Sequence, residues 1–163
     1  MAGQREDYVM RLIDELRTFV TRAIALRDNG QLDQALHTAV QAQERLFARP
    51  AAEFAARPVD EQLRLLTLDE SPDQARAKCL AYASILEEAG NVYQARARDD
   101  LAAGALQLAL YVRLTVALEN EPRAAELRPS IETLHSRLAA VPLSPPVREL
   151  LDKLPPAAKA AAT

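Results

Sequence analysis

The sequence has few of the residues on which metal, disulfide and nucleotide chemistry depend. Its 163 residues include one cysteine, Cys79, two histidines, four glycines and no tryptophan. A single cysteine excludes a disulfide within the chain and a zinc site built from several cysteines. The isolated glycines exclude a Gly-rich phosphate loop, and their scarcity argues against a β-rich fold. These absences argue against a catalytic or cofactor-binding protein.

Neither sign of charge is in large excess. The chain has 20 Lys and Arg against 23 Asp and Glu, which gives a formal net charge of -3. A nucleic-acid-binding domain usually carries a basic excess on one face, so we expect no nucleic-acid partner. The first residues are polar and contain no recognisable signal peptide, which makes a cytoplasmic location the default expectation.

Long hydrophobic runs are also scarce, with one exception. The segment Leu101–Leu118 is long enough to raise the question of a membrane span. Gln107 and Arg113 interrupt it, and a charged residue at mid-bilayer is costly. No basic flank sets an orientation across a membrane. We therefore expect a buried central helix and no membrane contact.

Helix-forming residues are what the chain has in abundance. Ala and Leu dominate a hydrophobic content of 49%, and both are strong helix formers. Apolar residues recur at helical spacing, and no segment alternates as a strand would. We predict an all-α fold of about six to seven helices, in one domain over residues 1–154. The Ala/Pro-rich tail, 155–163, is expected to be disordered.

Gly, Pro and capping residues place the helix boundaries. They predict helices at about 5–28, 32–48, 59–68, 72–97, 101–119, 123–140 and 144–154. Asn29-Gly30 ends the first helix, and the short connection makes the first two helices antiparallel neighbours. Residues 49–70 form a connector, with a turn of helix near 51–56. Because the connector is rich in Leu and contains Phe54, we expect it to pack on the body.

Two interpretations are open for the helix that begins at Ser71-Pro72, where Ser can cap and Pro suits the first helical position. The helix could end at Gly90-Asn91, as the first helix ends at its own glycine. Alternatively, it could continue to about Ala97. The apolar stripe that starts at Cys79 keeps its phase across Gly90, and an interior Gly costs only about 1 kcal/mol. The longer helix is therefore favoured.

Both helix pairs, about 5–48 and 72–119, resemble the tetratricopeptide unit, in which two antiparallel helices pack through small residues. In the first pair the matching positions are Phe19, Ala23, Leu26, Gly30, Ala35 and Ala42. In the second they are Leu86, Gly90, Asn91 and Tyr93, with Ala102 or Ala105 on the partner helix. The inserted connector, the longer helices and a second turn without Gly depart from a regular repeat. The segment Asp7–Ile13, followed by such a pair, is also similar to a small uncharacterised bacterial family of tetratricopeptide-like proteins.

The resemblance implies a right-handed helical stack that binds a protein or peptide along a groove lined by the first helix of each pair. It implies that the groove is lined by Ser84, Glu87, Asn91 and Gln94. Glu87 stands where a basic residue would bind a carboxylate, so an acidic C-terminal peptide is not the expected ligand. The expected function is a non-enzymatic interaction module of modest affinity, without a cofactor.

Self-association is the second hypothesis. The helix expected at 101–119 has more apolar surface than one pairing needs. One side of it carries Leu106, Leu110, Leu114 and Leu118. These leucines could be covered by residues 123–153 or by a second copy, which would make the protein a homodimeric structural protein.

An enzyme is the remote alternative. His37 and His135 are expected on solvent-facing helix surfaces, and neither has a second metal ligand at i+4. Cys79 lies on an inward stripe with no His expected near it. Without a nucleophile, base and orienting group in one place, we expect no catalytic residue and no metal site.

Three arginines, Arg96, Arg98 and Arg113, are the remaining charged feature. They could form a basic spot near the second turn that contacts an acidic peptide or nucleic acid. Pairing with Asp99 and Asp100 is the favoured interpretation.

Overall fold

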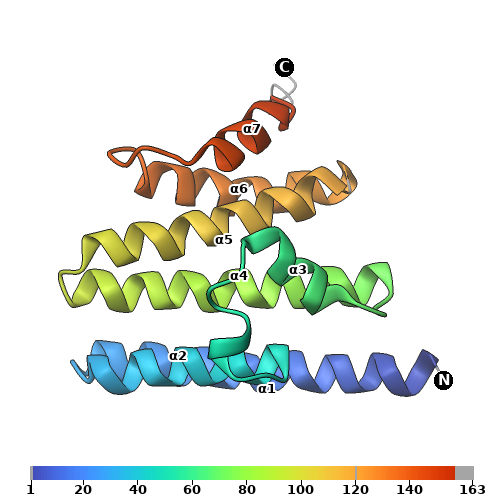
Figure 1. Ribbon diagram of the computed structural model, residues 1–163, viewed down its shortest axis with the longest axis horizontal. Coiled ribbons are helices and arrows are strands. Elements are labelled where there is room, and N and C mark those ends of the chain that lie inside the picture. Colours follow the sequence, from blue (N-terminus) through green and yellow to red (C-terminus); the bar gives the residue numbers. More distant parts are fainter. Residues whose placement is uncertain (1, 120, 157–163) are drawn as a thin grey trace, which may run out of the picture.

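Helices make up nearly all of the structure (Figure 1). The computed structural model describes residues 2–119 and 121–156, which contain seven α-helices, one 3-10 helix and no strand. The helices are α1 (Ala2–Asp28), α2 (Leu32–Phe47), η1 (the 3-10 helix, Ala51–Glu53), α3 (Val59–Thr67), α4 (Pro72–Ala95), α5 (Asp99–Glu119), α6 (Glu121–Arg137) and α7 (Pro145–Lys153). The predicted all-α class and number of helices are confirmed.

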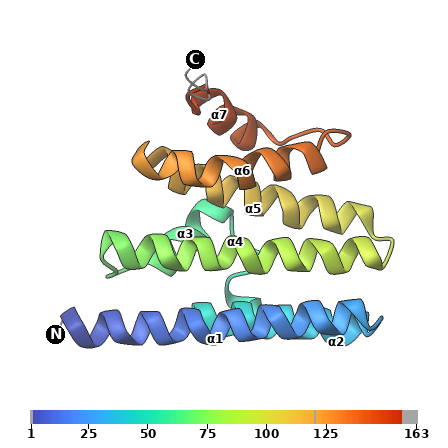
Figure 2. The same ribbon diagram turned by 180° about the vertical axis from the view of Figure 1, so that it is seen from behind.

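The long helices stack roughly in chain order. α1 and α2 lie together at one end, α4 packs against both, and α5, α6 and α7 follow toward the other end (Figures 1 and 2). α5 is central, since it packs against α4, α6 and α7. One hydrophobic cluster contains buried residues from all seven α-helices.

The turn between α1 and α2 is the one that Gly30 predicts. Gly30 has a φ of +78°, which only glycine adopts without a side-chain penalty. The N–H of Gln31 donates to the carbonyl of Leu26 at 2.8 Å and closes the turn. Alanines at the tetratricopeptide-like small positions are buried in this pair: Ala23, Ala35 and Ala42. The first helix pair therefore forms as expected.

α4 decides between the two interpretations of Gly90. The helix runs through this residue to Ala95, so the longer helix is confirmed, ending slightly before the expected Ala97. A Cβ at Gly90 would stand 2.8 Å from Cδ2 of Leu106, so the glycine allows α5 to approach closely. At the other end of α4, the Ser71 hydroxyl accepts the N–H of Gln74 at 3.2 Å.

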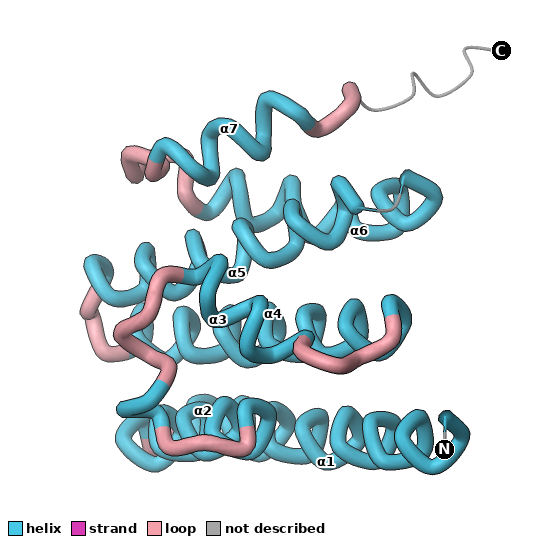
Figure 3. The backbone as a smooth tube through the Cα atoms, turned by 45° about the vertical axis from the view of Figure 1, so that its right-hand side comes forward, coloured by secondary structure: helices cyan, strands magenta, loops and turns pink. Residues whose placement is uncertain are grey.

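The connector packs on the body, as its composition predicts (Figure 3). The ring of Phe54 is fully buried and stacks on Phe47 with 4.1 Å between centroids. The buried amide of Gln62 donates to the carbonyls of Phe54 and Arg57 at 3.1 and 3.0 Å. The hydroxyl of Tyr82 on α4 donates to Gln62 Oε1 at 2.6 Å. The connector is thus tied to α4 by a buried amide.

Other boundaries differ from the prediction by small amounts. α5 begins at Asp99, so Asp99 and Asp100 lie in its first turn, where acidic residues favour the helix dipole. α6 ends at Arg137, a few residues before the expected 140, and it continues through Pro129. Of the tail that was expected to be disordered, residues 157–163 lie outside the residues that the structure describes.

Three of the four leucines expected to mediate self-association are buried by this chain alone. Leu106, Leu110 and Leu114 are at most 2% exposed, whereas Leu118 is half-buried. The helices packed on α5, namely α4, α6 and α7, account for its coverage. Of the two alternatives, cover by the chain's own helices is the one observed for these three side chains.

α5 is the one helix among the described residues that is long and apolar enough to cross a membrane. Only its length and composition suggest a membrane span, and the core helix of a globular protein meets the same two criteria. Here the helix lies at the centre of the stack and contributes nine buried residues. Its central position agrees with the predicted buried helix.

Candidate partner-binding groove

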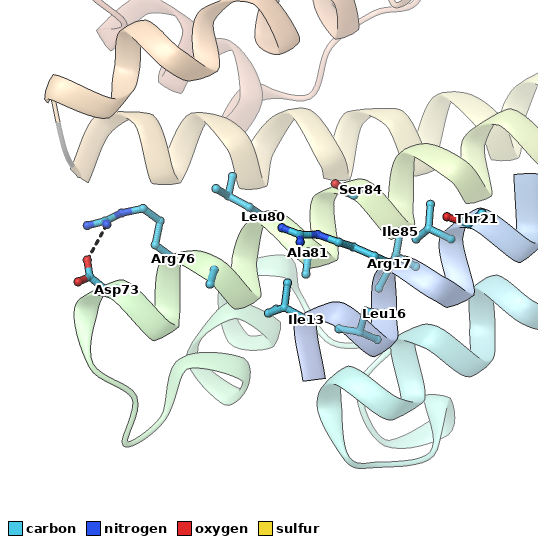
Figure 4. A pocket seen from close by; sticks show the side chains of 12 residues that line it. Ile13, Leu16, Arg17, Thr21, Asp73, Arg76, Leu80, Ala81, Ser84 and Ile85 are labelled. Atoms are coloured by element: carbon cyan, nitrogen blue, oxygen red, sulfur yellow. Dashed lines mark hydrogen bonds and ion pairs between the residues drawn. The ribbon is translucent and has the colours of Figure 1, made fainter. Parts of the chain in front are cut away.

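A groove of about 610 Å³ lies between α1 and α4 (Figure 4). α1 and α4, the two helices that line it, lie in front of the connector in the view of Figure 2. Its floor includes partly exposed apolar residues from both helices: Ile13, Val20, Ala77, Leu80 and Ala81. We call this feature the α1/α4 groove.

The apolar wall on α1 follows from the width of that helix's hydrophobic stripe. Leu12 and Leu16 are buried in the core, while Ile13 and Val20 lie at the side of the same stripe and stay partly exposed. An amphipathic helix with one partner needs a stripe only about 100° wide. The wider stripe of α1 serves α2, α4 and the groove together.

Two ion pairs fix α1 at both ends of the groove. Near the start of α1, Arg5 pairs with Glu70, which also accepts from Lys78 Nζ at 3.0 Å. Near the end of α1, Arg27 Nε donates to Glu88 Oε1 at 2.6 Å. The side chains of Glu70 and Glu88 are 0% and 4% exposed. Movement of α1 away from α4 would remove a cation from each of these poorly exposed carboxylates, which opposes the movement.

The electrostatics of Glu70 show that its cations outweigh its burial. Burial acts to raise the pKa of this carboxyl, whereas hydrogen bonds from Arg5 and Lys78 act to lower it. The net effect is a pKa below the ordinary value. Glu70 is therefore held as a carboxylate at neutral pH, and the anchor stays charged.

Two of the four residues expected to line a groove are bound by Arg113 of α5. Its Nε donates to Glu87 Oε1 at 2.7 Å and its Nη2 to Glu87 Oε2 at 3.1 Å. The same Nη2 lies 3.4 Å from the hydroxyl of Ser84. Ser84 lines the α1/α4 groove, and Glu87 does not. The charge of Glu87 is thus neutralised within the chain.

The other two expected residues are bound by Arg137 at the end of α6. Its Nη2 donates to Asn91 Oδ1 and to Gln94 Oε1, each at 2.7 Å. Asn91 in turn donates to Glu88 Oε2 at 3.1 Å. Ser84, Glu87, Asn91 and Gln94 therefore lie along one side of α4, held by contacts with neighbouring helices. A role for them in binding a partner stays a prediction.

Two arginines stand on the walls of the α1/α4 groove. Arg17 comes from α1 and Arg76 from α4, with Leu80 between them in the view of Figure 4. Arg17 contacts Asp14 at 3.3 Å, and Arg76 contacts Asp73 at 2.9 Å. Asp73 is the one carboxylate among the described residues that line the groove. Sequence reasoning missed both arginines, because neither stands out from the other exposed cations of the chain.

The three arginines near the second turn form separate pairs. Arg96 pairs with Asp33 of α2, Arg98 with Asp100, and Arg113 with Glu87. Pairing with nearby acids was the favoured interpretation, but Asp100 is the one expected acid that takes part. The hydrogen bond from Arg98 lowers the pKa of the Asp100 carboxyl. These pairings give no support for a shared basic spot.

The residues most often used in catalysis lie apart from the groove. His37 and His135 are exposed, as expected. Cys79 lines a second cavity of about 270 Å³ between α3, α4 and α5. Burial, together with the charge of Glu119, raises the pKa of its thiol to about 12, so the nucleophilic thiolate is not formed at neutral pH. Within residues 2–119 and 121–156, no group of His, Cys, Asp and Glu is arranged to hold a metal ion.

Comparison with known proteins gives no family for this chain. No protein-family model, curated protein or solved structure matches it significantly. The tetratricopeptide resemblance therefore stays a prediction. A functional argument has to start from the α1/α4 groove itself.

Proposed function

We propose that this chain is a non-enzymatic interaction module that binds a protein or peptide segment in the α1/α4 groove. The observation that carries the proposal is an apolar floor left partly exposed between two helices, which are joined by the part-buried pair of Arg27 and Glu88 and by the pair of Arg5 and Glu70. Protein interfaces combine an apolar centre with a polar rim. The groove has the same arrangement, with Arg17, Thr21 and Ser84 beside its apolar residues.

Preorganisation supports the same proposal. Binding costs conformational freedom, and a site already fixed before binding avoids part of that cost. Arg27 and Glu88 fix one end of α1 against α4, and Arg5 fixes the other end through Glu70. The groove can therefore receive a partner without rearrangement of its walls.

The proposed site differs from the one expected from the tetratricopeptide resemblance. Ser84 belongs to both, since it lines the groove and contacts Arg113. Glu87, Asn91 and Gln94 are engaged by arginines of α5 and α6, so we assign them to the edge of the site. The centre of the proposed site is the floor around Leu80 and Val20.

A peptide-display selection tests the proposal. Immobilised full-length chain would select from a library of random 16-residue peptides, and the enriched peptides would be measured by fluorescence anisotropy. Val20→Lys and Leu80→Glu place a charge on each wall of the groove. Leu101→Glu is the matched control, because Leu101 is exposed and lies on α5 outside the groove. Circular dichroism and thermal melting would first show that each variant is folded.

The groove is supported if the enriched peptides bind the wild type and Leu101→Glu but bind Val20→Lys or Leu80→Glu at least about tenfold more weakly. That loss corresponds to about 1.4 kcal/mol. One folded groove variant suffices, so failure of the other to fold does not spoil the test. Enrichment of no peptide, or equal binding by all variants, would reject the proposal.

A further inference from the structure

We infer that the segment recognised by the α1/α4 groove is an amphipathic helix with acidic residues beside its apolar stripe. The inference rests on the proposed function and specifies its partner. Three properties of the groove carry it: the secondary structure of its walls, its length and its charge.

Helical walls favour a helical occupant. An extended peptide gains much of its affinity by pairing its backbone with the edge of a sheet. Both walls of this groove are formed by α-helices, α1 and α4, whose backbone N–H and C=O groups bond within each helix. A helical partner satisfies its own backbone and needs only side-chain contacts from the groove.

The length of the groove fits a short helix. Its lining residues run from Ile13 to Thr21 on α1 and from Asp73 to Ile85 on α4. At about 1.5 Å per residue these walls are roughly 12 and 18 Å long, which matches two to three turns of helix. A helix of that size presents apolar residues at i, i+3, i+4 and i+7, enough to cover Ile13, Val20 and Leu80.

The charge of the groove favours acidic flanks on that helix. Arg17 and Arg76 line it from opposite walls, against the single carboxylate of Asp73. Each arginine pairs with the aspartate three residues before it on the same helix, Arg17 with Asp14 and Arg76 with Asp73. The side chains of these aspartates are 70% and 87% exposed. The Arg17–Asp14 pair is exposed on both sides and contributes little to stability, so Asp14 gives way readily to a partner's carboxylate. The Arg76 side chain is 16% exposed, but its partner Asp73 is 87% exposed and can also be replaced by a partner's carboxylate.

Arg113 removes the strongest argument against an acidic ligand. From the sequence alone, Glu87 stands where it would repel a carboxylate. In the structure, two hydrogen bonds from Arg113 neutralise Glu87, which lies outside the groove lining. A partner's carboxylate would therefore meet Arg17 and Arg76, each already paired with an aspartate of its own helix, and would bind by replacing Asp14 or Asp73. The whole chain has a formal net charge of -3.

A second display library tests this inference. Each 18-residue peptide carries a fixed helical stripe of apolar residues, and its flanking positions are varied among Glu, Gln and Lys. Wild-type chain, the charge-reversed double variant Arg17→Glu/Arg76→Glu and the control Arg98→Glu each select from this library. Arg98 is an exposed arginine at the turn before α5, outside the groove, and its exposed pair with Asp100 resembles the exposed pair of Arg17 and Asp14.

We expect the wild type and Arg98→Glu to enrich Glu at the flanking positions and the double variant to enrich Lys. An enriched acidic peptide should bind the double variant about tenfold more weakly than the wild type, with a difference that shrinks at high salt. Circular dichroism should show helix in the bound peptide. Enrichment that depends on the apolar stripe and on Leu80 but ignores flanking charge would overturn the inference and leave the proposed function standing. Enrichment of nothing from either library would overturn both.

Discussion

Arg27 on α1 and Glu88 on α4 form a part-buried ion pair between these two helices, with 2.6 Å between Nε and Oε1. The carboxylate of Glu88 also accepts from Asn91 at 3.1 Å, and Asn91 accepts from Arg137 of α6. Three helices thus meet at one buried acid. Loss of Arg27 would leave the Glu88 carboxylate, which is 4% exposed, with the Asn91 amide but without its cation, and a buried charge without a counter-ion is destabilising.

The first prediction concerns this pair. Arg27→Gln should lower the free energy of unfolding by about 2 kcal/mol, because the poorly exposed carboxylate of Glu88 loses its main donor. Arg45→Gln is the control: Arg45 pairs with Glu15, both are exposed, and the loss should stay under about 1 kcal/mol. Urea denaturation measures both. The double variant Arg27→Gln/Glu88→Gln should lose less than the sum of the two single variants. Equal losses for Arg27→Gln and Arg45→Gln would show that the pair does not anchor α1.

The second prediction uses the close approach of α4 and α5. Gly90→Ala should gain about 1 kcal/mol of helix propensity. Its Cβ would stand 2.8 Å from Cδ2 of the buried Leu106, however, and overpacking of this kind costs about 1–3 kcal/mol. The expected result is a net loss of stability. In a Leu106→Ala background the contact is gone, and the same change should be stabilising.

Gly104 supplies the matched control for Gly90. It lies inside α5, and a Cβ there would meet no atom within 4 Å. Gly104→Ala should therefore raise the free energy of unfolding by about 1 kcal/mol. If Gly90→Ala stabilised the wild type as much as Gly104→Ala does, the glycine would not be needed for packing.

Much of the fold could be predicted from the sequence because it depends on local signals. Gly30 ends α1, Ser71-Pro72 starts α4, and the phase of the apolar stripe across Gly90 indicates a continuous helix. The Leu and Phe content of the connector predicts that it packs on the helices, but no sequence pattern indicates that the side-chain amide of Gln62 holds it in place.

The candidate groove was only partly predictable, because its contacts join distant parts of the chain. Arg5 and Glu70 are 65 residues apart, and Arg27 and Glu88 are 61 apart. In a chain with 43 charged residues, counted as 20 basic and 23 acidic, no pattern selects these pairs. The width of the α1 stripe was the usable signal, since it exceeds what one neighbouring helix can cover.

The third prediction concerns pH and Glu70. The folded-state pKa of this carboxyl is lowered from its ordinary value of 4.5. A lowered pKa stabilises the fold at pH values above the ordinary pKa, and that stability is lost as the pH falls through the folded value. Glu70→Gln should cost about 1.5–3 kcal/mol at neutral pH, because Arg5 and Lys78 lose a charged acceptor. The difference from wild type should be constant near neutrality and shrink as the pH drops below 4.5.

Urea denaturation of both proteins over this pH range measures that difference directly. The other carboxyls are common to both proteins and cancel in the comparison. Glu53→Gln is a control, because Glu53 makes one exposed pair, with Arg49 at 3.9 Å. A gap between wild type and Glu70→Gln that stayed constant into the acid range would contradict the lowered pKa.

The last prediction separates a core role from self-association for the leucines of α5. Leu110 is 0% exposed within the single chain. Leu110→Glu should therefore unfold the protein, because a carboxylate there would be buried without a partner. Leu101→Glu, on the same helix at an exposed position, should stay folded. If α5 instead served mainly to join two copies, Leu110→Glu would give a folded monomer from a wild-type dimer. Circular dichroism together with light scattering distinguishes these outcomes, since loss of helical signal in Leu110→Glu alone is expected only when α5 forms the chain's own core.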